Sequence, residues 1–273
     1  MLQKIGILCA GDDELAPFLA LQEGRSARRA TMLTIHEGRI SGVQTAALFS
    51  GVCKVNAAIA AQVLISGCQV DAIINAGTAG GLDSGLSVFD TVVGTEAAYH
   101  DVAGDILTEF HPWLKSIWFP ADPVLLSLAR RAAQGLEYPI RFGRMVTGEA
   151  FLSGSGADAV RSAFHPLCAD METAAVAHVC HVNRVPFLSI RTITDLADGS
   201  SASCFEANCR QASEISAQVT AALLSALRAS GQSVWPETDP RARRLSRRPG
   251  LLMQPEETAA PSPTGRSKQK DKR

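Results

Sequence analysis

Apolar runs typical of β-strands alternate with helix-like segments from residue 4 to about residue 230, and this alternation is the strongest constraint on the fold. The predicted strands cover residues 4–10, 71–77, 89–99, 141–151 and 186–194. The predicted helices cover residues 12–22, 54–67, 122–135, 156–164, 172–183 and 204–230. Residues 31–51 predict two strands of a hairpin that turns near residues 37–42. We therefore expect an α/β fold with a mixed, mostly parallel central sheet covered by helices.

The periodic pattern stops after Gly231. Residues 232–273 are rich in proline and in basic residues, and they lack the periodic apolar positions that would bury enough surface to offset chain entropy. We expect one folded domain over residues 1–231 and a basic, proline-rich disordered tail over residues 232–273. The run RARRLSRR in this tail is a weak signal for an anionic partner, and a solvated linker is the simpler interpretation.

Charge and cysteine content narrow the functional class. The chain has 273 residues and a net charge of −1, but residues 235–273 hold ten Lys/Arg against five Asp/Glu, which leaves a charge of −6 on the body. An acidic body does not favour a nucleic-acid partner. No run approaches the roughly 20 apolar residues of a membrane span, and the apolar start meets acidic residues too soon for a signal peptide. Seven cysteines without a CxxC pair favour reduced thiols in the cytoplasm.

The strand at 186–194 carries charge inside an otherwise apolar run. Arg191 lies within it, Asp195 ends it, and the two fall on the same face of the strand. Burying a charge is unfavourable unless the charge has a partner. Either the two residues form an internal ion pair, or the end of this strand belongs to a site.

Two further acidic residues, Glu14 and Glu172, follow other predicted strands. Each lies near a helix start, where an acid is favoured by the helix dipole, so each alone could be a cap. Together with Asp195 they are expected at one edge of the sheet, beside the glycine-rich segment AGTAGG (76–81). Carboxylates that converge in this way repel one another unless a ligand or a proton relieves the repulsion, so the arrangement predicts a site.

Six segments extend this interpretation to the whole body of the chain. In order and spacing, they resemble the 5′-methylthioadenosine/S-adenosylhomocysteine nucleosidases of the nucleoside phosphorylase superfamily: KIGILCAGDDEL, NAGTAGGL, DTVVGTEAAYHD, TGEAF, DMETAAVAHV and IRTITDLAD. The resemblance covers about residues 3–228. It implies a three-layer phosphorylase/hydrolase-like fold and a homodimer that acts on a small nucleoside with no cofactor and no metal.

The resemblance also implies catalytic roles. Glu14 matches the acid that activates the attacking water, and Asp195 matches the acid that protonates purine nitrogen 7. Glu172 matches the residue that binds the ribose hydroxyls. These roles suit cleavage of an N-glycosidic bond, which passes through an oxocarbenium-like state and needs an acid for the leaving adenine and a base for water.

Further residues match substrate-binding positions of the family. Phe151 matches the ring that stacks on adenine, and Leu152 matches a residue whose backbone bonds to adenine. Met171 and Thr78 match residues beside the ribose. Arg191 is expected near the site, where its charge would make several close acids tolerable.

Phosphorylases of the same superfamily are the first alternative, because they use phosphate in place of water. Phosphate binding favours arginines and backbone donors, whereas the first loop here is Gly-Asp-Asp-Glu, with no arginine until Arg25, and Asn75 precedes the glycine-rich segment. Water is therefore the favoured nucleophile.

A nucleoside-binding sensor without activity is the second alternative.

The substrate stays open at this stage. Gly11 replaces the methionine that often lines the 5′ pocket in the family, and residues 105–119 differ from its familiar members. Methylthioadenosine, S-adenosylhomocysteine, 5′-deoxyadenosine and aminodeoxyfutalosine are all candidates. Three aromatic residues in or next to that segment could contact ligand, the body or a second subunit: Trp113, Trp118 and Phe119. For His100 and Asp101, a structural or interface role is favoured over an acid/base pair, and Asp198 has no assigned role.

Overall fold

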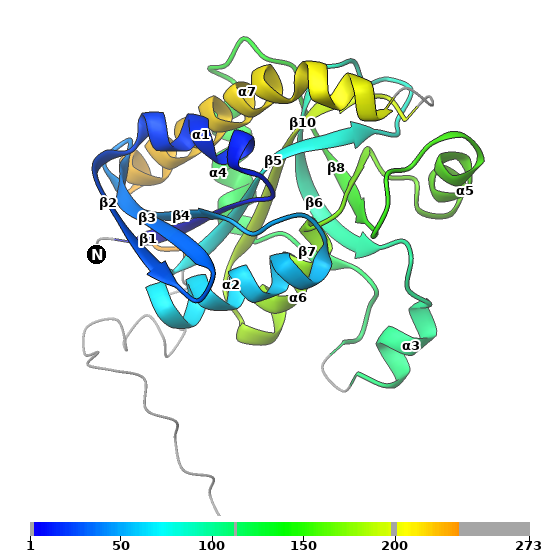
Figure 1. Ribbon diagram of the computed structural model, residues 1–273, viewed down its shortest axis with the longest axis horizontal. Coiled ribbons are helices and arrows are strands. Elements are labelled where there is room, and N and C mark those ends of the chain that lie inside the picture. The colour runs from blue at the N-terminus through cyan, green and yellow to red at the C-terminus, as the bar shows by residue number, and fades with distance from the viewer. Residues whose placement is uncertain (1–2, 112–113, 198–200, 235–273) are drawn as a thin grey trace, which may run out of the picture.

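The computed structural model describes residues 3–111, 114–197 and 201–234, which form helices around one mixed sheet (Figure 1). The strands are β1 (Lys4–Cys9), β2 (Glu23–Ala30), β3 (Leu33–Ile40), β4 (Val43–Phe49), β5 (Ala72–Gly81), β6 (Thr91–Tyr99), β7 (Phe119–Pro120), β8 (Ile140–Thr147), β9 (Cys168–Asp170) and β10 (Phe187–Asp195). The helices are α1 (Asp12–Leu21), α2 (Lys54–Cys68), α3 (Gly104–Glu109), α4 (Pro123–Ala133), α5 (Gly154–Phe164), α6 (Thr173–Asn183) and α7 (Ser201–Ser230).

The layers follow from the alternation of side chains along the buried strands. On β1, Ile5 and Ile7 point to one face of the sheet and pack with α1, α4 and α7. Leu8 points to the other face and packs with α2 and α6. Figure 1 shows α1 and α7 on one side of the sheet and α2 and α6 on the other. The predicted fold class, a mixed central sheet covered by helices, is confirmed.

Part of the sheet closes on itself. The strand order is β10-β6-β8-β9-β5-β1-β4-β3-β2, and β10 also pairs with β5, so β5, β9, β8, β6 and β10 form a ring. Within this ring, Gly80 of β5 pairs with both Ala169 of β9 and Asp195 of β10. The ends of these three strands therefore meet, although β9 runs antiparallel to β5.

The hairpin region contains one more strand than the sequence predicts. β2, β3 and β4 form an antiparallel meander, and its second turn lies at Ser41 and Gly42, both with positive φ. β2 has the sequence EGRSARRA and is almost entirely exposed, so no apolar alternation marks it. Three other elements were not predicted because they are too short to show a periodic pattern: α3, β7 and β9.

The described chain continues beyond the predicted domain end at residue 231. Val234 is fully buried in the core that includes α4 and α7, and the carbonyl of Gln232 accepts a hydrogen bond from Gln3. The folded domain therefore reaches at least Val234, and the rest of the predicted tail, residues 235–273, lies outside the described residues. Within the described ranges, we find no helix with the length and apolar character needed to cross a bilayer.

Two truncations test whether residues 232–234 and residues 235–273 contribute to the stability of the folded domain. Deleting residues 235–273 is expected to leave the melting temperature unchanged. A chain that ends at residue 231 also loses Val234, whose burial contributes about 1.5–3 kcal/mol, and its melting temperature is expected to fall by about 3–10 °C. Differential scanning calorimetry of the two truncated chains and the full chain measures this, and equal melting temperatures for both truncations would contradict the buried role of Val234.

Candidate active site

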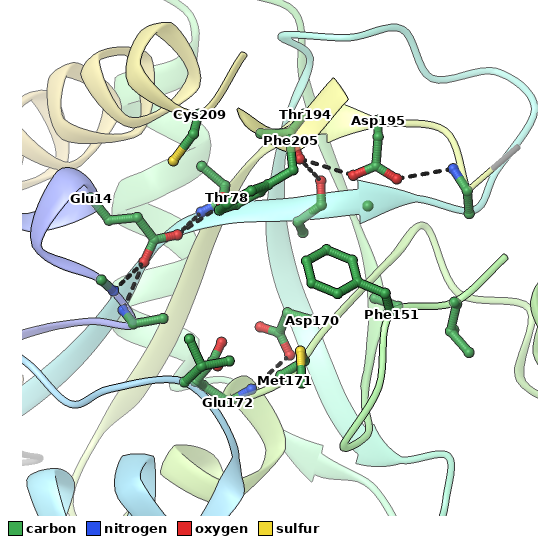
Figure 2. A pocket seen from close by; sticks show the side chains of 18 of the residues that line it. Glu14, Thr78, Phe151, Asp170, Met171, Glu172, Thr194, Asp195, Phe205 and Cys209 are labelled. Carbon is green, nitrogen blue, oxygen red and sulfur yellow. Dashed lines mark hydrogen bonds between the residues drawn. The ribbon is translucent and has the colours of Figure 1, made fainter. Parts of the chain in front are cut away.

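A cavity of about 330 Å³ lies where the carboxyl ends of β1, β5, β9 and β10 meet (Figure 2). Seven of the eight predicted site residues line it: Glu14, Thr78, Phe151, Leu152, Met171, Glu172 and Asp195. They come from five different parts of the chain, and the closed ring of strands brings them together. The eighth residue, Arg191, lies in the protein interior behind the cavity lining and is fully buried.

Glu14 is held on every side by hydrogen-bond donors. Its Oε2 accepts from the backbone N–H groups of Ala10 at 2.7 Å and Gly11 at 3.3 Å. Its Oε1 accepts from the N–H of Thr78 at 2.7 Å and from the Thr78 hydroxyl at 2.8 Å. The bond from Gly11 caps α1, as the sequence allowed, but the bonds from Thr78 tie the same carboxylate to β5 across the cavity wall.

Gly77 permits this approach. A Cβ at residue 77 would lie 2.4 Å from Glu14 Oε1, and the φ of +153° disfavours any other residue. Gly77, the first glycine of the AGTAGG segment, therefore allows the carboxylate of Glu14 to pack closely against β5.

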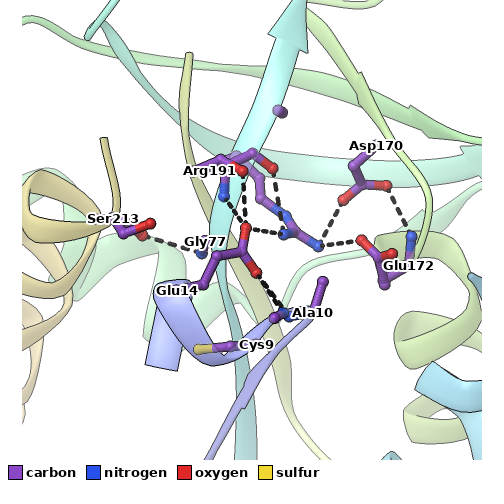
Figure 3. Close-up of polar contacts among 12 residues, drawn as sticks. Cys9, Ala10, Glu14, Gly77, Asp170, Glu172, Arg191 and Ser213 are labelled. Atoms are coloured by element: carbon purple, nitrogen blue, oxygen red, sulfur yellow. Dashed lines mark hydrogen bonds and ion pairs between the residues drawn. The ribbon is translucent and has the colours of Figure 1, made fainter. Parts of the chain in front are cut away.

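Three carboxylates surround the guanidinium of Arg191 (Figure 3). Its Nη2 lies 2.7 Å from Asp170 Oδ2 and 3.4 Å from Glu172 Oε2, and its Nη1 lies 3.8 Å from Glu14 Oε1. Burial opposes the charge of Arg191, but Asp170, Glu14 and Glu172 outweigh that effect and raise its pKa. Nη2 also donates to Asn75 Oδ1 at 2.7 Å. The ion-pair partners of this arginine are therefore Asp170, Glu172 and Glu14, so the alternative of an internal pair with Asp195 is not formed.

Glu172 titrates near neutral pH. It is 3% exposed, and its Oε1 accepts a hydrogen bond from the N–H of Cys53 at 3.0 Å. Burial, with Asp170 and Glu14 nearby, raises the pKa of Glu172 to about 7, although Arg191 and the Cys53 N–H act in the opposite direction. Its carboxylate does not cap α6, whose first residue is Thr173. The burial of Glu172 among other acids therefore favours its protonated form.

Asp170 lines the cavity and contacts Arg191, but the sequence analysis assigned it no role. It forms the shortest ion pair of Arg191, and its Oδ1 accepts from the Thr147 hydroxyl at 2.6 Å and the Thr173 N–H at 3.1 Å. The motif DMET contained it, but the three-residue strand β9 gave no sign that this aspartate would face the arginine. Asp170 competes with Glu172 for Arg191 and so helps to keep the pKa of Glu172 high.

Asp195 lies at the opposite end of the cavity from Glu172 (Figure 2). Its Oδ2 accepts from the Thr194 hydroxyl at 3.0 Å, and its Oδ1 accepts from the N–H of Ala197 at 3.1 Å. The carbonyl of Thr194 in turn accepts from Asn208 of α7 at 2.8 Å. A register shift between Ile193 and Asp195 displaces the aspartate from the regular alternation that predicted a common face with Arg191.

The wall near Asp195 is apolar and aromatic. Phe151 is 56% exposed and meets Phe205 of α7 edge to face, with ring centroids 5.9 Å apart. Phe205 and Cys209 line the cavity and were not predicted. Trp118 packs on Phe164, and these contacts lie outside the cavity lining.

Three further residues named in the sequence analysis lie either in the core or outside the described residues. Phe119 is buried and stacks on His178, which places it in the body. Trp113 and Asp198 lie outside the described residues. In residues 3–111, 114–197 and 201–234, no group of three or more His, Cys, Asp or Glu side chains is arranged to hold a metal ion.

The cavity lining is acidic. Among the described residues, the lining includes no lysine, arginine or histidine. It includes six acids: Asp12, Asp13, Glu14, Asp170, Glu172 and Asp195. An anion such as phosphate would meet repulsion there, whereas a neutral or cationic ligand would not.

Comparisons with known proteins agree with this geometry. A family model described as the phosphorylase superfamily matches residues 4–225. A 5′-methylthioadenosine/S-adenosylhomocysteine nucleosidase from Chromohalobacter salexigens is 34% identical over 232 residues, which is 83% of this chain and 98% of that relative. The chain belongs to this nucleosidase family of the phosphorylase superfamily.

Solved structures of similar proteins have the same fold. The nucleosidase from Neisseria meningitidis, in complex with methylthio-immucillin-A, is similar with a TM-score of 0.78 and 33% identity, over 83% of this chain and all of that chain. A futalosine hydrolase from Helicobacter pylori is similar with a TM-score of 0.75 and 26% identity, over 82% of this chain and 98% of that chain.

Because the pKa of Glu172 is raised, its contribution to the free energy of unfolding is expected to depend on pH. The ordinary pKa of 4.5 describes the unfolded chain and about 7 describes the folded one. The contribution of Glu172 is therefore fully present below pH 4.5 and is lost as the pH rises through 7. The Glu172→Gln variant has no titrating group at this position. The melting temperature of the variant minus that of the unmodified protein is therefore expected to increase between pH 4.5 and about 7. A difference that stays constant with pH would contradict the assignment.

Proposed function

We propose that this chain hydrolyses the N-glycosidic bond of 5′-substituted adenosine nucleosides, releasing adenine and the 5-substituted ribose. Its proposed substrates are 5′-methylthioadenosine and S-adenosylhomocysteine, with 5′-deoxyadenosine as a further candidate. The observation that carries the proposal is the set of three carboxylates, Glu14, Glu172 and Asp195, around one cavity whose described lining holds no basic side chain. The names of the related proteins support the same chemistry.

Asp195 is the proposed general acid. Two donors, the Thr194 hydroxyl and the Ala197 N–H, fix the plane of its carboxyl group at the cavity wall. Each bond uses one lone pair, and a carboxyl group has further positions for a proton and for a bond to substrate. Phe151 and Leu152 line the same end, which supports adenine binding there with its nitrogen 7 toward Asp195. Protonation makes adenine a better leaving group.

Glu14 is the proposed base that orients the attacking water. Its carboxylate already accepts four hydrogen bonds, so a water molecule must displace one donor to reach it. Three of those donors are backbone N–H groups with fixed positions. The Thr78 hydroxyl is the fourth, and because it can rotate, it is the donor that yields to water. Thr78 would then be free to bond the ribose.

Glu172 is the proposed ribose ligand, with Met171 beside it. In its ionised form, Glu172 accepts hydrogen bonds from ribose hydroxyls and stabilises positive charge that develops on the sugar. Arg191 and the Cys53 N–H favour that ionised form. Its pKa of about 7 gives the proposal a pH dependence, because protonation of Glu172 on the acid side weakens ribose binding.

Phosphorolysis is less compatible with the electrostatics. Arg191 is the cation nearest the carboxylate cluster in the described part of the chain, and its partners are already Asp170, Glu172 and Glu14. A phosphate dianion would have to displace one of them and enter a lining of acids. Water carries no such penalty, and the three carboxylates also argue against a sensor without activity.

The size of the 5′ substituent stays part of the proposal. An added Cβ at Gly11 would meet no atom within 4 Å, and Gly11 lines the cavity. This open space suits a long substituent such as that of S-adenosylhomocysteine. The futalosine hydrolase among the similar structures keeps aminodeoxyfutalosine as a candidate.

The proposal includes a cytoplasmic homodimer. Four apolar side chains on or near the neighbouring helices α2 and α6 are about half or more exposed: Val52, Val55, Ile59 and Val182. Exposed apolar patches of this kind favour protein–protein contact. Among the described residues, no disulfide joins any of the cysteines, which suits a reducing compartment.

Asp195→Asn tests the proposed mechanism. Because asparagine cannot donate the proton that adenine requires, turnover of methylthioadenosine is expected to fall by about 10²–10⁴, with adenine affinity nearly unchanged. Adenine release followed by chromatography, and calorimetric titration with adenine, measure the two quantities.

Asp90→Asn is the matched control, because Asp90 is also buried and accepts a backbone N–H, from Ser87, away from the cavity. It is expected to keep full turnover. If Asp195→Asn kept most of the activity, Asp195 would be excluded as the general acid. If the unmodified protein released adenine from none of the candidate nucleosides, the proposed function itself would be wrong.

A further inference from the structure

Two loops that contribute residues to the cavity lining are joined by one polar network. The first loop, residues 50–53, connects β4 to α2, and the N–H of its Cys53 donates a hydrogen bond to Glu172. The second, residues 148–153, connects β8 to α5 and carries Phe151. The N–H of Lys54 donates to Glu149 Oε1 at 3.1 Å, which links the two loops directly.

Asp101 lies at the centre of this network, although it belongs to neither loop and is not part of the cavity lining. Its two carboxylate oxygens accept from Lys54 Nζ at 2.9 and 2.8 Å, and its Oδ2 also accepts from the Glu149 N–H at 3.0 Å. Burial disfavours its charge, but Lys54 and the Glu149 N–H outweigh burial and lower the pKa of Asp101. One carboxylate thus holds the first residue of α2 and the start of the second loop.

The backbone of Cys53 shows why the first loop needs to be held. Cys53 has a φ of +85°, in a region that favours glycine, so its conformation is strained. Hydrogen bonding to Glu149 raises the pKa of the Cys53 thiol to about 11, so the thiol stays protonated and is a further link between the loops. The strained conformation aims the Cys53 N–H at Glu172.

We propose that Asp101 and Lys54 are positioning residues, which hold the two loops so that the Cys53 N–H meets Glu172 and Phe151 faces the purine. The proposal rests on the proposed nucleosidase function. It gives a role to Asp101, which neighbours His100. His100 Nε2 is buried without a hydrogen-bond partner among the described residues, and burial lowers the pKa of this histidine, so it does not share the charge of the network.

An ion pair elsewhere in the protein provides a matched control. Lys4 Nζ lies 2.6 Å from Glu37 Oε1, with side chains 26% and 31% exposed, against 2.8 Å, 20% and 27% for Lys54 and Asp101. Lys4 and Glu37 lie on β1 and β3, away from the cavity. Partly exposed pairs contribute little to stability. Asp101→Asn, Lys54→Met and Glu37→Gln are therefore all expected to lower the melting temperature by no more than about 3 °C.

Kinetics separate the two pairs. Asp101→Asn and Lys54→Met are each expected to lower kcat/KM for methylthioadenosine by about 10–100-fold, because small displacements of a binding group have effects of this size. KM rises and kcat falls together, since both the ribose ligand and the purine stack are displaced. The double variant is expected to lose no more than either single variant, because the two residues act as one unit. Glu37→Gln keeps the kinetics of the unmodified protein.

The pH profile gives a readout that a merely structural role would not move. Glu172 faces Arg191, Asp170, Glu14 and the Cys53 N–H, and the Cys53 bond lowers its pKa. If Asp101→Asn releases that N–H, the pKa of Glu172 rises and the acid limb of the kcat/KM profile moves to higher pH.

Hydrogen–deuterium exchange tests the same loops without any substrate. Asp101→Asn is expected to speed exchange at the amides of Cys53, Lys54 and Glu149, and Glu37→Gln is not. Unchanged exchange, or an unchanged kcat/KM and acid limb, would overturn the proposal. A protein that cleaved no candidate nucleoside would instead refute the proposed function, and the exchange measurement would still decide whether Asp101 orders the loops.

Discussion

Arg191 is fully buried among Asp170, Glu172 and Glu14, and this cluster is the interaction on which the cavity depends. Three carboxylates this close would repel one another without a cation between them. Removing one partner of such a buried pair leaves charge uncompensated, at a cost of about 3–5 kcal/mol. A single arginine shared by three acids does not satisfy all of them equally. Burial, with Asp170 and Glu14 nearby, raises the pKa of Glu172 to about 7, so its charge depends on pH.

The fold makes this cluster possible by closing part of its sheet. Parallel pairing alone would bring together the ends of β1, β5 and β10, which carry or precede Glu14, Thr78 and Asp195. The ring through β9 adds the end that carries Asp170, followed by Met171 and Glu172. Asp195 and Glu172 thus lie at opposite ends of the cavity, where we propose that the purine and the ribose bind (Figure 2).

Sequence reasoning recovered most of this arrangement and failed at specific places. Acidic residues at predicted strand ends and helix starts were visible, which is why Glu14, Glu172 and Asp195 were found. Asp170 and the strand β2 were missed, because a three-residue strand and an exposed polar strand carry no apolar pattern. Arg191 was expected beside several acids, but the sequence could not exclude a pair with Asp195, since the register shift before Asp195 and the closure of the ring both depend on contacts distant in sequence.

The central claim is that the acidic cavity uses water, because its buried arginine is already occupied by carboxylates. The most direct test is the initial rate of adenine release from 5′-methylthioadenosine in phosphate-free buffer and with added phosphate, with the sugar product identified by mass spectrometry. The account predicts the same rate in both buffers and an unphosphorylated sugar. A rate that requires phosphate, with a sugar 1-phosphate as the product, would contradict it.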